Sequence, residues 1–413
     1  MTVPYLVLVV LAALGYLILW KEGLLRRKSA LFLSAALLLA VMALRGAMLG
    51  HETLDYQTFL HAWVEDFRRA GGFPGLRMDV WDFSVACNYN VPYLYFLAGF
   101  TYLPVRDLYL IKLLSCLFDL LLAWGVLRLV SRFRKGDFAR LLSFFLTLLL
   151  PTVLLNGAYW GQCDSIYGAL AVWSLVFALE DKPIRSVLAA ALSFSFKLQA
   201  VFLLPVYLIF LFARKVKWWH LLFFPLGYAA AIAPAVALGR PWKETALLYF
   251  SQAGSVGGGL NYNSSSVYAL LPGDGDTAQL AQIGILAAFG FLLLLYVLCY
   301  IRRRRLDPRA LLGCAALICV AIPFLLPHMH DRYFFLADVL TLALAVVSPR
   351  LAPVPAAVSF ASLLGYHAYL KMQYLLPMRY GAIALAAVVA VLLLDLLYVL
   401  FRSTKKEARP KRG

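Results

Sequence analysis

Apolar segments of about 15 to 22 residues follow one another along almost the whole chain, separated by short polar or basic runs. A segment of this length can cross a bilayer as a helix, which satisfies its own backbone hydrogen bonds in lipid. Hydrophobic residues make up 63% of the chain and charged residues 14%, a balance that soluble globular domains do not have. The sequence therefore predicts an all-α polytopic membrane protein, with residues 1–413 forming a single integral membrane domain.

About 13 transmembrane helices are expected from these segments. They cover residues 3–20, 29–48, 107–130, 141–158, 165–180, 184–197, 198–213, 218–238, 279–300, 310–326, 333–348, 353–371 and 380–401. Residues 91–104 are also apolar but reach only about half the length that spans a bilayer, so we expect a re-entrant or surface helix there.

The distribution of positive charge predicts the orientation of the chain. If residues 91–104 do not cross, 26 of the 38 Lys and Arg residues fall on one side; if they cross, this asymmetry is lost. Cytoplasmic segments are enriched in Lys and Arg, so we expect that side to be the cytoplasm, with the N-terminus outside. Residues 402–413 would then be a basic cytoplasmic tail lying against anionic lipid headgroups. Membrane topology thus accounts for the net charge of +17, and nucleic-acid binding is not expected.

Two long segments are expected on the outer side. Residues 49–106 would form a helical first outer loop, and residues 239–278 a second outer loop that is mobile and polar because it is rich in Gly, Ser and Asn. The first loop is dense in acidic residues and His: Glu52, Asp55, His61, Glu65, Asp66, Asp79 and Asp82. A carboxylate beside a bilayer is costly to hold, which makes this loop the candidate catalytic segment.

The other prominent polar motifs fall at the outer ends of predicted spans. They are NGAYWGQCDSIY with Gln162 and Asp164, FSFKLQ with Lys197 and Gln199, and PHMHDRYFF with His328, His330, Asp331, Arg332 and Tyr333. Scattered polar residues without a function would not be expected to converge on one face of the membrane. Together with the first outer loop, these motifs predict a single site at the outer membrane–water boundary.

Four motifs in order, LDYQTFLHAW with NVPYLYFLA, LLNGAYWGQCDSIYGAL, FSFKLQAVFLLP and PHMHDRYFFLADVL, resemble a known family. The resemblance is to bacterial relatives of the second mannosyltransferase of GPI-anchor biosynthesis (PIG-V-like), within the GT-C class of glycosyltransferases, and covers residues 45 to 345. It implies a GT-C-like fold of roughly this span count, a polyprenyl-phosphate sugar donor and an acidic base in the first outer loop. That base maps onto Asp55, with Glu52 as the nearest competitor. No DxD motif is present here, so the use of a divalent cation, Mg or Mn, stays open, and the metal ligands are unknown.

Each candidate residue also has a structural interpretation. Asp55 is expected to take the proton of the acceptor hydroxyl, although it also suits a helix N-cap. Arg332 is the leading candidate for donor phosphate binding, because its planar fork can bind two phosphate oxygens. Lys197 is the second candidate, or it snorkels to the surface. His328 and His330 would bind phosphate or sugar; two residues apart, they do not share a helical face for a metal.

A further group of residues is assigned to sugar or acceptor binding. It comprises Glu52, Gln162, Asp164, Gln199, Asp331 and Tyr333, with Asp164 alternatively capping a helix. Trp63, Trp81 and Trp160 are candidates for stacking on a sugar ring. Within the spans, Asp119 is expected to pair with Lys112 or a hydroxyl, and Asp395 has no obvious partner.

These observations favour an inverting glycosyltransferase that moves a sugar, most simply mannose, from a polyprenyl phosphate to an acceptor. The acceptor would be a glycan, glycolipid or protein at the outer face of a bacterial cytoplasmic membrane. Two alternatives stay open: a ligase or polymerase of lipid-linked oligosaccharides, and a lipid-linked sugar transporter or flippase. A transporter would place polar groups at the bilayer midplane of two related halves, and no internal repeat is visible.

Overall fold

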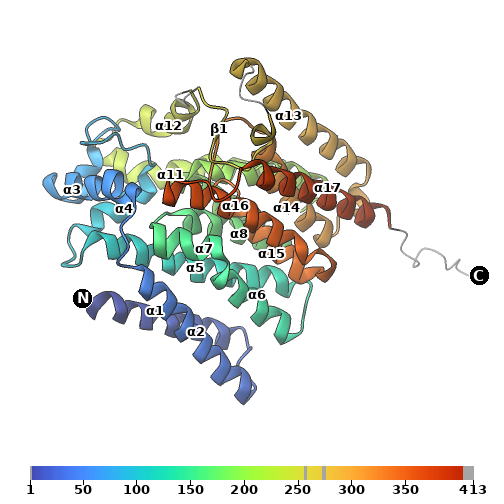
Figure 1. Cartoon of the computed structure of the whole chain (residues 1–413), viewed down its shortest axis with the longest axis horizontal. Coiled ribbons are helices and arrows are strands. Elements are labelled where there is room, and N and C mark those ends of the chain that lie inside the picture. The colour runs from blue at the N-terminus through green and yellow to red at the C-terminus, as the bar shows by residue number, and fades with distance from the viewer. Residues whose placement is uncertain (1, 255–257, 272–275, 403–413) are drawn as a thin grey trace, which may run out of the picture.

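The computed structural model describes residues 2–254, 258–271 and 276–402, and this part of the chain is an all-α bundle (Figure 1), as predicted. Its helices and helical turns are α1 (Thr2–Lys21), α2 (Lys28–Met48), η1 (Tyr56–Leu60), α3 (His61–Arg69), η2 (Phe73–Arg77), α4 (Val91–Phe100), α5 (Asp107–Ser131), α6 (Asp137–Leu149), α7 (Pro151–Leu154), η3 (Leu155–Trp160), α8 (Asp164–Leu179), α9 (Pro183–Phe196), η4 (Leu198–Leu203), α10 (Val206–Phe212), η5 (Trp218–Leu222), α11 (Phe223–Ala237), α12 (Trp242–Gly254), η6 (Val267–Leu270), α13 (Thr277–Ile301), η7 (Arg303–Arg305), α14 (Pro308–Leu325), α15 (Phe335–Val347), η8 (Pro349–Leu351), α16 (Pro353–Lys371) and α17 (Arg379–Phe401). Two short strands, β1 (Asn261–Tyr262) and β2 (Met329–His330), pair in parallel.

Among the described residues, the helices that have the length and hydropathy of a membrane span do not confirm the 13 spans expected from the sequence. Among the described residues, 8 helices are long and apolar enough, or up to 9 if α6 and the following α7–η3 segment, bent by 46°, form one span. Four of the expected spans correspond to α8, α9, η4–α10 and α15, whose apolar stretches have fewer than 18 residues. The expected count of 13 is therefore not reproduced.

The short helices lie inside the bundle. α8 has 16 residues and is almost entirely buried, which at 1.5 Å per residue gives a length of about 24 Å. A bilayer core is about 30 Å thick, so such a helix ends before it has crossed. Non-helical backbone at that depth is tolerated where protein surrounds it or where it lines a cavity. The ends of α8, α9 and α15 are where the polar motifs lie.

The two predicted outer segments contain more regular structure than loops. Residues 49–106 include η1, α3, η2 and α4, and the 10-residue α4 is short, as expected for a helix that does not cross. The second segment, residues 239–278, contains α12, β1 and η6 rather than only a mobile polar loop. Its residues 255–257 and 272–275, and residues 403–413 of the basic tail, lie outside the described residues.

A buried ion pair fixes the amino-terminal hairpin to the bundle. Arg45 on α2 donates two hydrogen bonds, of 2.8 and 3.1 Å, to Asp119 on α5, and both side chains are fully buried. The other carboxylate oxygen of Asp119 accepts a hydrogen bond of 2.5 Å from Ser165 at the start of α8. Asp119 therefore pairs with Arg45 and a hydroxyl, and not with Lys112, whose ammonium group binds the carbonyls of Met48 and His51.

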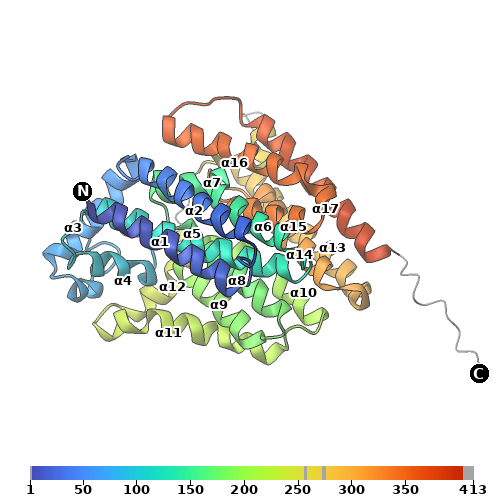
Figure 2. The same ribbon diagram turned by 90° about the horizontal axis from the view of Figure 1, so that it is seen from below.

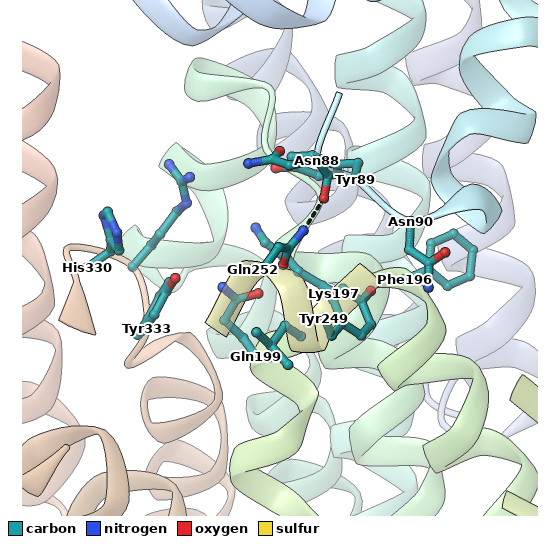
Figure 3. A pocket seen from close by; sticks show the side chains of 12 residues that line it. Asn88, Tyr89, Asn90, Phe196, Lys197, Gln199, Tyr249, Gln252, His330 and Tyr333 are labelled. Atoms are coloured by element: carbon teal, nitrogen blue, oxygen red, sulfur yellow. Dashed lines mark hydrogen bonds between the residues drawn. The ribbon is translucent and has the colours of Figure 1, made fainter. Parts of the chain in front are cut away.

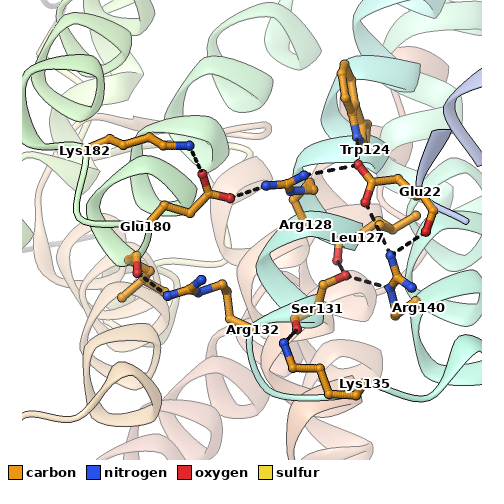
Figure 4. Close-up of polar contacts among 11 residues, drawn as sticks. Glu22, Trp124, Leu127, Arg128, Ser131, Arg132, Lys135, Arg140, Glu180 and Lys182 are labelled. Carbon is orange, nitrogen blue, oxygen red and sulfur yellow. Dashed lines mark hydrogen bonds and ion pairs between the residues drawn. The ribbon is translucent and has the colours of Figure 1, made fainter.

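The basic segments meet at one end of the bundle. Figure 4 shows Glu22, at the end of α1, between Trp124, Arg128 and Arg140, while Glu180 lies between Arg128 and Lys182. These residues connect the α1–α2 turn, the end of α5, the start of α6 and the end of α8. In Figures 1 and 2, α3 and α4 lie at the opposite end of the molecule from the end of α17.

Asp395 belongs to the same end. Its carboxylate accepts hydrogen bonds from Arg309 (2.6 Å) and Arg350 (2.5 Å), so the partner that the sequence did not indicate is a pair of arginines. Arg309 is the second residue of α14, and Arg350 lies in η8. Asp395 thereby connects α17 to both elements.

Replacing Asp119 with Leu is expected to leave the Arg45 guanidinium buried and without its counter-charge. Removing one partner of a buried pair costs about 3–5 kcal/mol, so the free energy of unfolding in detergent should fall by that order. The double variant Arg45→Leu/Asp119→Leu should recover part of the loss. The control Glu65→Leu removes one side of an exposed pair with Arg68 and should cost at most about 1 kcal/mol. Equal unfolding temperatures for Asp119→Leu and the unmodified protein would contradict this role.

Candidate active site

The carboxylate of Asp55 is the most heavily hydrogen-bonded group of the site. Its Oδ2 accepts hydrogen bonds from Trp160 Nε1 (2.8 Å), Gln162 Nε2 (2.5 Å) and Arg332 Nη1 (3.3 Å). Its Oδ1 accepts a hydrogen bond from the hydroxyl of Tyr369. Asp55 lies in the first turn of the helix that continues through η1 and α3, and its side chain makes no cap hydrogen bond. The N-cap interpretation of Asp55 is therefore excluded.

Charges alternate through the site from Asp55 to Lys197. Arg332 lies between Asp55 and Asp164, whose Oδ2 is 4.0 Å from Arg332 Nε. The other oxygen of Asp164 forms an ion pair with Lys197. Since Asp55, Asp164 and Lys197 are each less than a tenth exposed, partners of opposite charge must offset the cost of burying them.

The ends of short helices supply these charges. Asp164 is the first residue of α8, Lys197 follows the last residue of α9, and Arg332 lies three residues before α15. Asn156 Nδ2 donates a hydrogen bond of 2.6 Å to Asp164, so this carboxylate is used for side-chain contacts and not as a helix cap. Lys197 is directed inward to Asp164 and does not snorkel to the surface.

Two glycines let the backbone approach the site closely. Gly161 has φ +83°, a left-handed conformation that ends η3 and turns the chain from Trp160 to Gln162. Gly365 on α16 packs against the backbone of Asn263 and Asp331, where a Cβ atom would lie 2.6 Å from one carbonyl oxygen. Because only Gly fits there, α16 can reach the loop that carries Arg332.

Two cavities share a wall at this cluster. One, of about 210 Å³, is shown in Figure 3 and is lined by Asn88, Tyr89, Asn90, Phe196, Lys197, Leu198, Gln199, Tyr249, Gln252, His330, Arg332 and Tyr333. The other, of about 150 Å³, is lined by Asp55, Phe59, Leu60, Trp63, Asn88, Tyr89, Gln162 and Arg332. Asn88, Tyr89 and Arg332 belong to both, so Asp55 and Lys197 open into neighbouring spaces on either side of these residues.

A larger groove adjoins the first cavity. It has a volume of about 540 Å³ and lies between residues 79–88 and α12. Apolar side chains such as Val80, Trp81, Leu247 and Leu248 form much of its wall, and the charged residues Asp79, Lys243 and Glu244 also line it. Asn88 and Gln252 line both this groove and the first cavity. In Figure 3 these two residues lie side by side, and Gln252 Nε2 donates a hydrogen bond to the Asn88 carbonyl.

Burial shifts the titration of two neighbours of Arg332. Burial, together with the charges of Arg332 and Lys197, lowers the pKa of His330 to about 4, so its imidazole is neutral at physiological pH. Burial raises the pKa of Asp331 to about 7, while the adjacent Arg332 acts in the opposite direction. Asp331 Oδ1 is buried without a hydrogen-bond partner, which agrees with a cost for its charged form.

The structure brings most of the predicted site residues together. Asp55, Gln162, Asp164, Lys197, Gln199, His330, Arg332 and Tyr333 either line the two cavities or bond to residues that do, and Asp331 lies beside Arg332. Glu52 and His328 lie apart from them. Glu52 pairs with Arg106 at 2.5 Å near the surface, and the ring of the half-buried His328 hydrogen-bonds to the Gly259 carbonyl at 2.7 Å.

Several aromatic residues of the site were not predicted. Tyr369 donates to Asp55, Tyr89 donates a hydrogen bond of 3.1 Å to Gln162 Oε1, and Tyr249 lines the first cavity. Tyr369 and Tyr249 come from a predicted span and from the second outer segment, where Tyr is also typical of membrane interfaces. Tyr89 stands beside Asn88 and Asn90 in the run CNYN, a polar signal in the first outer loop that could have drawn attention to it.

Within the residues that the structure describes, no group of three or more His, Cys, Asp or Glu side chains is arranged to hold a metal ion. The alternating carboxylates and cations are each engaged with one another. The arrangement can place a carboxylate base and two cations around a ligand that extends across the two adjoining cavities, as group transfer from a phosphate requires.

Comparison with known families gives a match over most of the middle of the chain. The model of Glycosyltransferase family 87 matches residues 88–323, more than half of the 413 residues. No curated protein matches the chain. The matched range includes Tyr89, Asp164 and Lys197, whereas Asp55 and Arg332 lie on either side of it. The match agrees with the GT-C class expected from the sequence. It does not extend to the more specific resemblance to the second mannosyltransferase of GPI-anchor biosynthesis.

Asp331→Asn is expected to change how stability depends on pH. Because the pKa of about 7 lies above the ordinary value, the folded protein binds this proton more tightly than the unfolded chain, so stability falls as pH rises through that range. The unfolding temperature of the variant minus that of the unmodified protein should therefore increase from about pH 5 to about pH 8, because only the unmodified protein loses this stabilisation. Asp137→Asn, at an exposed carboxylate, is the control and should show no such trend. A pH-independent difference for Asp331→Asn would contradict the burial argument.

Proposed function

Because the chain belongs to glycosyltransferase family 87, a GT-C-type family of membrane glycosyltransferases, we propose that it moves a sugar from a polyprenyl-phosphate donor to an acceptor hydroxyl with inversion. The observation that carries this proposal is that Asp55 and Arg332, which are 277 residues apart in sequence, meet at 3.3 Å on the wall of one cavity. A carboxylate base and a guanidinium beside one space are what direct displacement of a phosphate requires.

The proposed reaction is a single displacement at the anomeric carbon. Asp55 takes the proton of the acceptor hydroxyl as its oxygen forms the new bond to the sugar. The bond between the anomeric carbon and the phosphate oxygen breaks, and its electron pair leaves with the polyprenyl phosphate. Arg332 and Lys197 stabilise the negative charge that develops on the departing phosphate. His330, neutral at physiological pH, serves as a hydrogen-bonding group.

Two features support a lipid-linked donor. The sequence has no Gly-rich phosphate loop of the kind that holds nucleotides. The groove of about 540 Å³, whose wall includes Val80, Trp81, Leu247 and Leu248, begins at Asn88 and Gln252, where the polar cavity with Lys197 ends. A polar cavity that continues into this groove fits a donor with a charged head and an isoprenoid chain. The phosphate would lie near Lys197 and Arg332, and the chain along α12.

The remaining assignments follow from the sequence. Mannose is proposed as the sugar because of the resemblance to the second mannosyltransferase of GPI-anchor biosynthesis. The charge distribution supports a bacterial cytoplasmic membrane with the basic end, including Arg128 and Arg140, in the cytoplasm and Asp55 at the outer face. A glycan, glycolipid or protein would supply the acceptor hydroxyl.

Asp55→Asn is the direct test. Purified protein in detergent is supplied with polyprenyl-phosphate mannose and a glycolipid acceptor, with and without EDTA to test for a divalent cation. Loss of a general base costs about 10² to 10⁴-fold in rate, so we expect transfer by the variant to fall by that order. Glu52→Gln, the matched change at the neighbouring surface acid, should retain activity within a factor of about three. Undiminished transfer by Asp55→Asn would overturn the proposed role, and donor flux into vesicles without an acceptor would favour a transporter.

Ala86→Trp tests the groove. A large ring at this groove-lining position should obstruct an isoprenoid chain, so kcat/KM for a long-chain donor is expected to fall about tenfold. A donor with only two isoprene units should be used nearly as well as by the unmodified protein. Ala47→Trp makes the same change in a separate hollow between α1 and α2 and should affect neither donor. Equal losses with both donors would argue against chain binding in this groove.

A further inference from the structure

Trp160 has contacts with both of the proposed reactive groups. Its indole N–H donates a hydrogen bond of 2.8 Å to Asp55, and its ring lies under the guanidinium of Arg332, 4.9 Å from the ring centre. The ring is completely buried, so neither contact is shared with solvent. A shift of this one side chain would move the carboxylate and the guanidinium together.

Tyr369 holds the other oxygen of the same carboxylate. Its ring stacks on Trp160 with centroids 4.9 Å apart and an interplanar angle of 22°, and its hydroxyl donates to Asp55 Oδ1. The two stacked rings thus present one donor to each oxygen of Asp55. Neither ring lines the cavity beside Asp55, so they hold the carboxylate without occupying the space for a ligand.

The distribution of donors distinguishes the two carboxylate oxygens. Oδ2 accepts from Trp160, Gln162 and Arg332, which exceeds the two lone pairs of one oxygen. Among the residues that the structure describes, Oδ1 accepts from Tyr369 only, so it has a lone pair left for an incoming hydroxyl. An acceptor hydroxyl therefore finds its proton acceptor at Oδ1, in the position that the Tyr369 hydrogen bond fixes.

The hydroxyl of Tyr369 is not needed to hold its helix in place. α16 and η3 are also joined by Lys371, whose ammonium group donates to the Tyr159 hydroxyl at 3.3 Å, and by the edge contact of Tyr366 with Trp160. The stack of Tyr369 on Trp160 depends on the ring and not on the hydroxyl. Replacing Tyr369 with Phe should thus remove one hydrogen bond and leave the packing intact.

We propose that Tyr369 and Trp160 are positioning residues that hold the Asp55 carboxylate so that Oδ1 accepts the proton of the acceptor hydroxyl. This inference rests on the proposed function, because it takes Asp55 as the base. The two residues act through Asp55 and Arg332 and need not contact the sugar. Tyr369 orients the oxygen that takes the proton. Trp160 fixes the position of Asp55 relative to Arg332, which stabilises the leaving phosphate.

Tyr369→Phe is the first test, with kcat and the donor KM measured separately. Loss of a hydrogen bond to a charged group should lower kcat about tenfold or more, while the KM for polyprenyl-phosphate mannose should stay within about twofold. Tyr374→Phe is the control, since it removes an equivalent hydroxyl that hydrogen-bonds to Asn263 at 2.6 Å instead. It should leave both constants unchanged. An unchanged kcat for Tyr369→Phe, or a change in KM alone, would overturn the inference.

A double-mutant cycle tests whether Tyr369 acts through Asp55. In Asp55→Glu the carboxylate is displaced, so adding Tyr369→Phe should cost much less than it does in the unmodified protein. Equal costs in both backgrounds would show that Tyr369 acts elsewhere. If Tyr369→Phe does not fold, Trp160→Phe, which removes the other donor, should give the same loss of kcat, and a normal kcat would reject the proposal. Absence of sugar transfer by the unmodified protein would reject the proposed function itself, and full activity of Asp55→Asn would reject Asp55 as the base. An inactive Asp55→Asn beside a normal Tyr369→Phe rejects only this inference.

Discussion

A charge buried in an apolar bundle needs a partner of opposite charge, and this requirement organises the molecule. Asp55, Arg332, Asp164 and Lys197 satisfy it by alternating in sign, so that each interior charge of the series lies between two of the other sign. Removing Arg332 would leave Asp55 buried without its counter-charge, and removing Asp164 would do the same to Lys197. The four residues come from four distant parts of the chain, so the requirement for pairing also holds those parts together.

Short helices explain how polar groups reach this depth. α8, α9 and α15 end inside the protein, and the chain that leaves them can carry charges there because other segments surround it. Longer helices such as α5 connect this region to the opposite end, where Glu22 and Glu180 pair with basic residues. The bundle therefore separates a polar cavity at one end from a basic surface at the other.

The sequence predicted which charged residues belong to the site better than it predicted the contacts between them. Asp55, Lys197 and Arg332 stand out because charged residues are rare beside apolar segments, and the structure brings them together. Tyr369 could not be recognised, because a tyrosine near the end of a span equally suits a membrane interface. The expected number of 13 spans is not confirmed, because hydropathy does not distinguish an apolar helix that faces lipid from one, such as α8, that is enclosed by protein.

The contact between Arg332 and Asp55 bears on the energetics of the proposed reaction. The base loses a negative charge when it takes the proton, and the leaving phosphate gains one, while the guanidinium of Arg332 lines both the cavity beside Asp55 and the cavity beside Lys197. The sum of charges inside the protein then stays constant throughout the step, and only its location changes. In a medium of low dielectric constant, relocating a charge beside a fixed cation is far less costly than creating one, so the enzyme would complete its chemistry before any proton has to leave for bulk water.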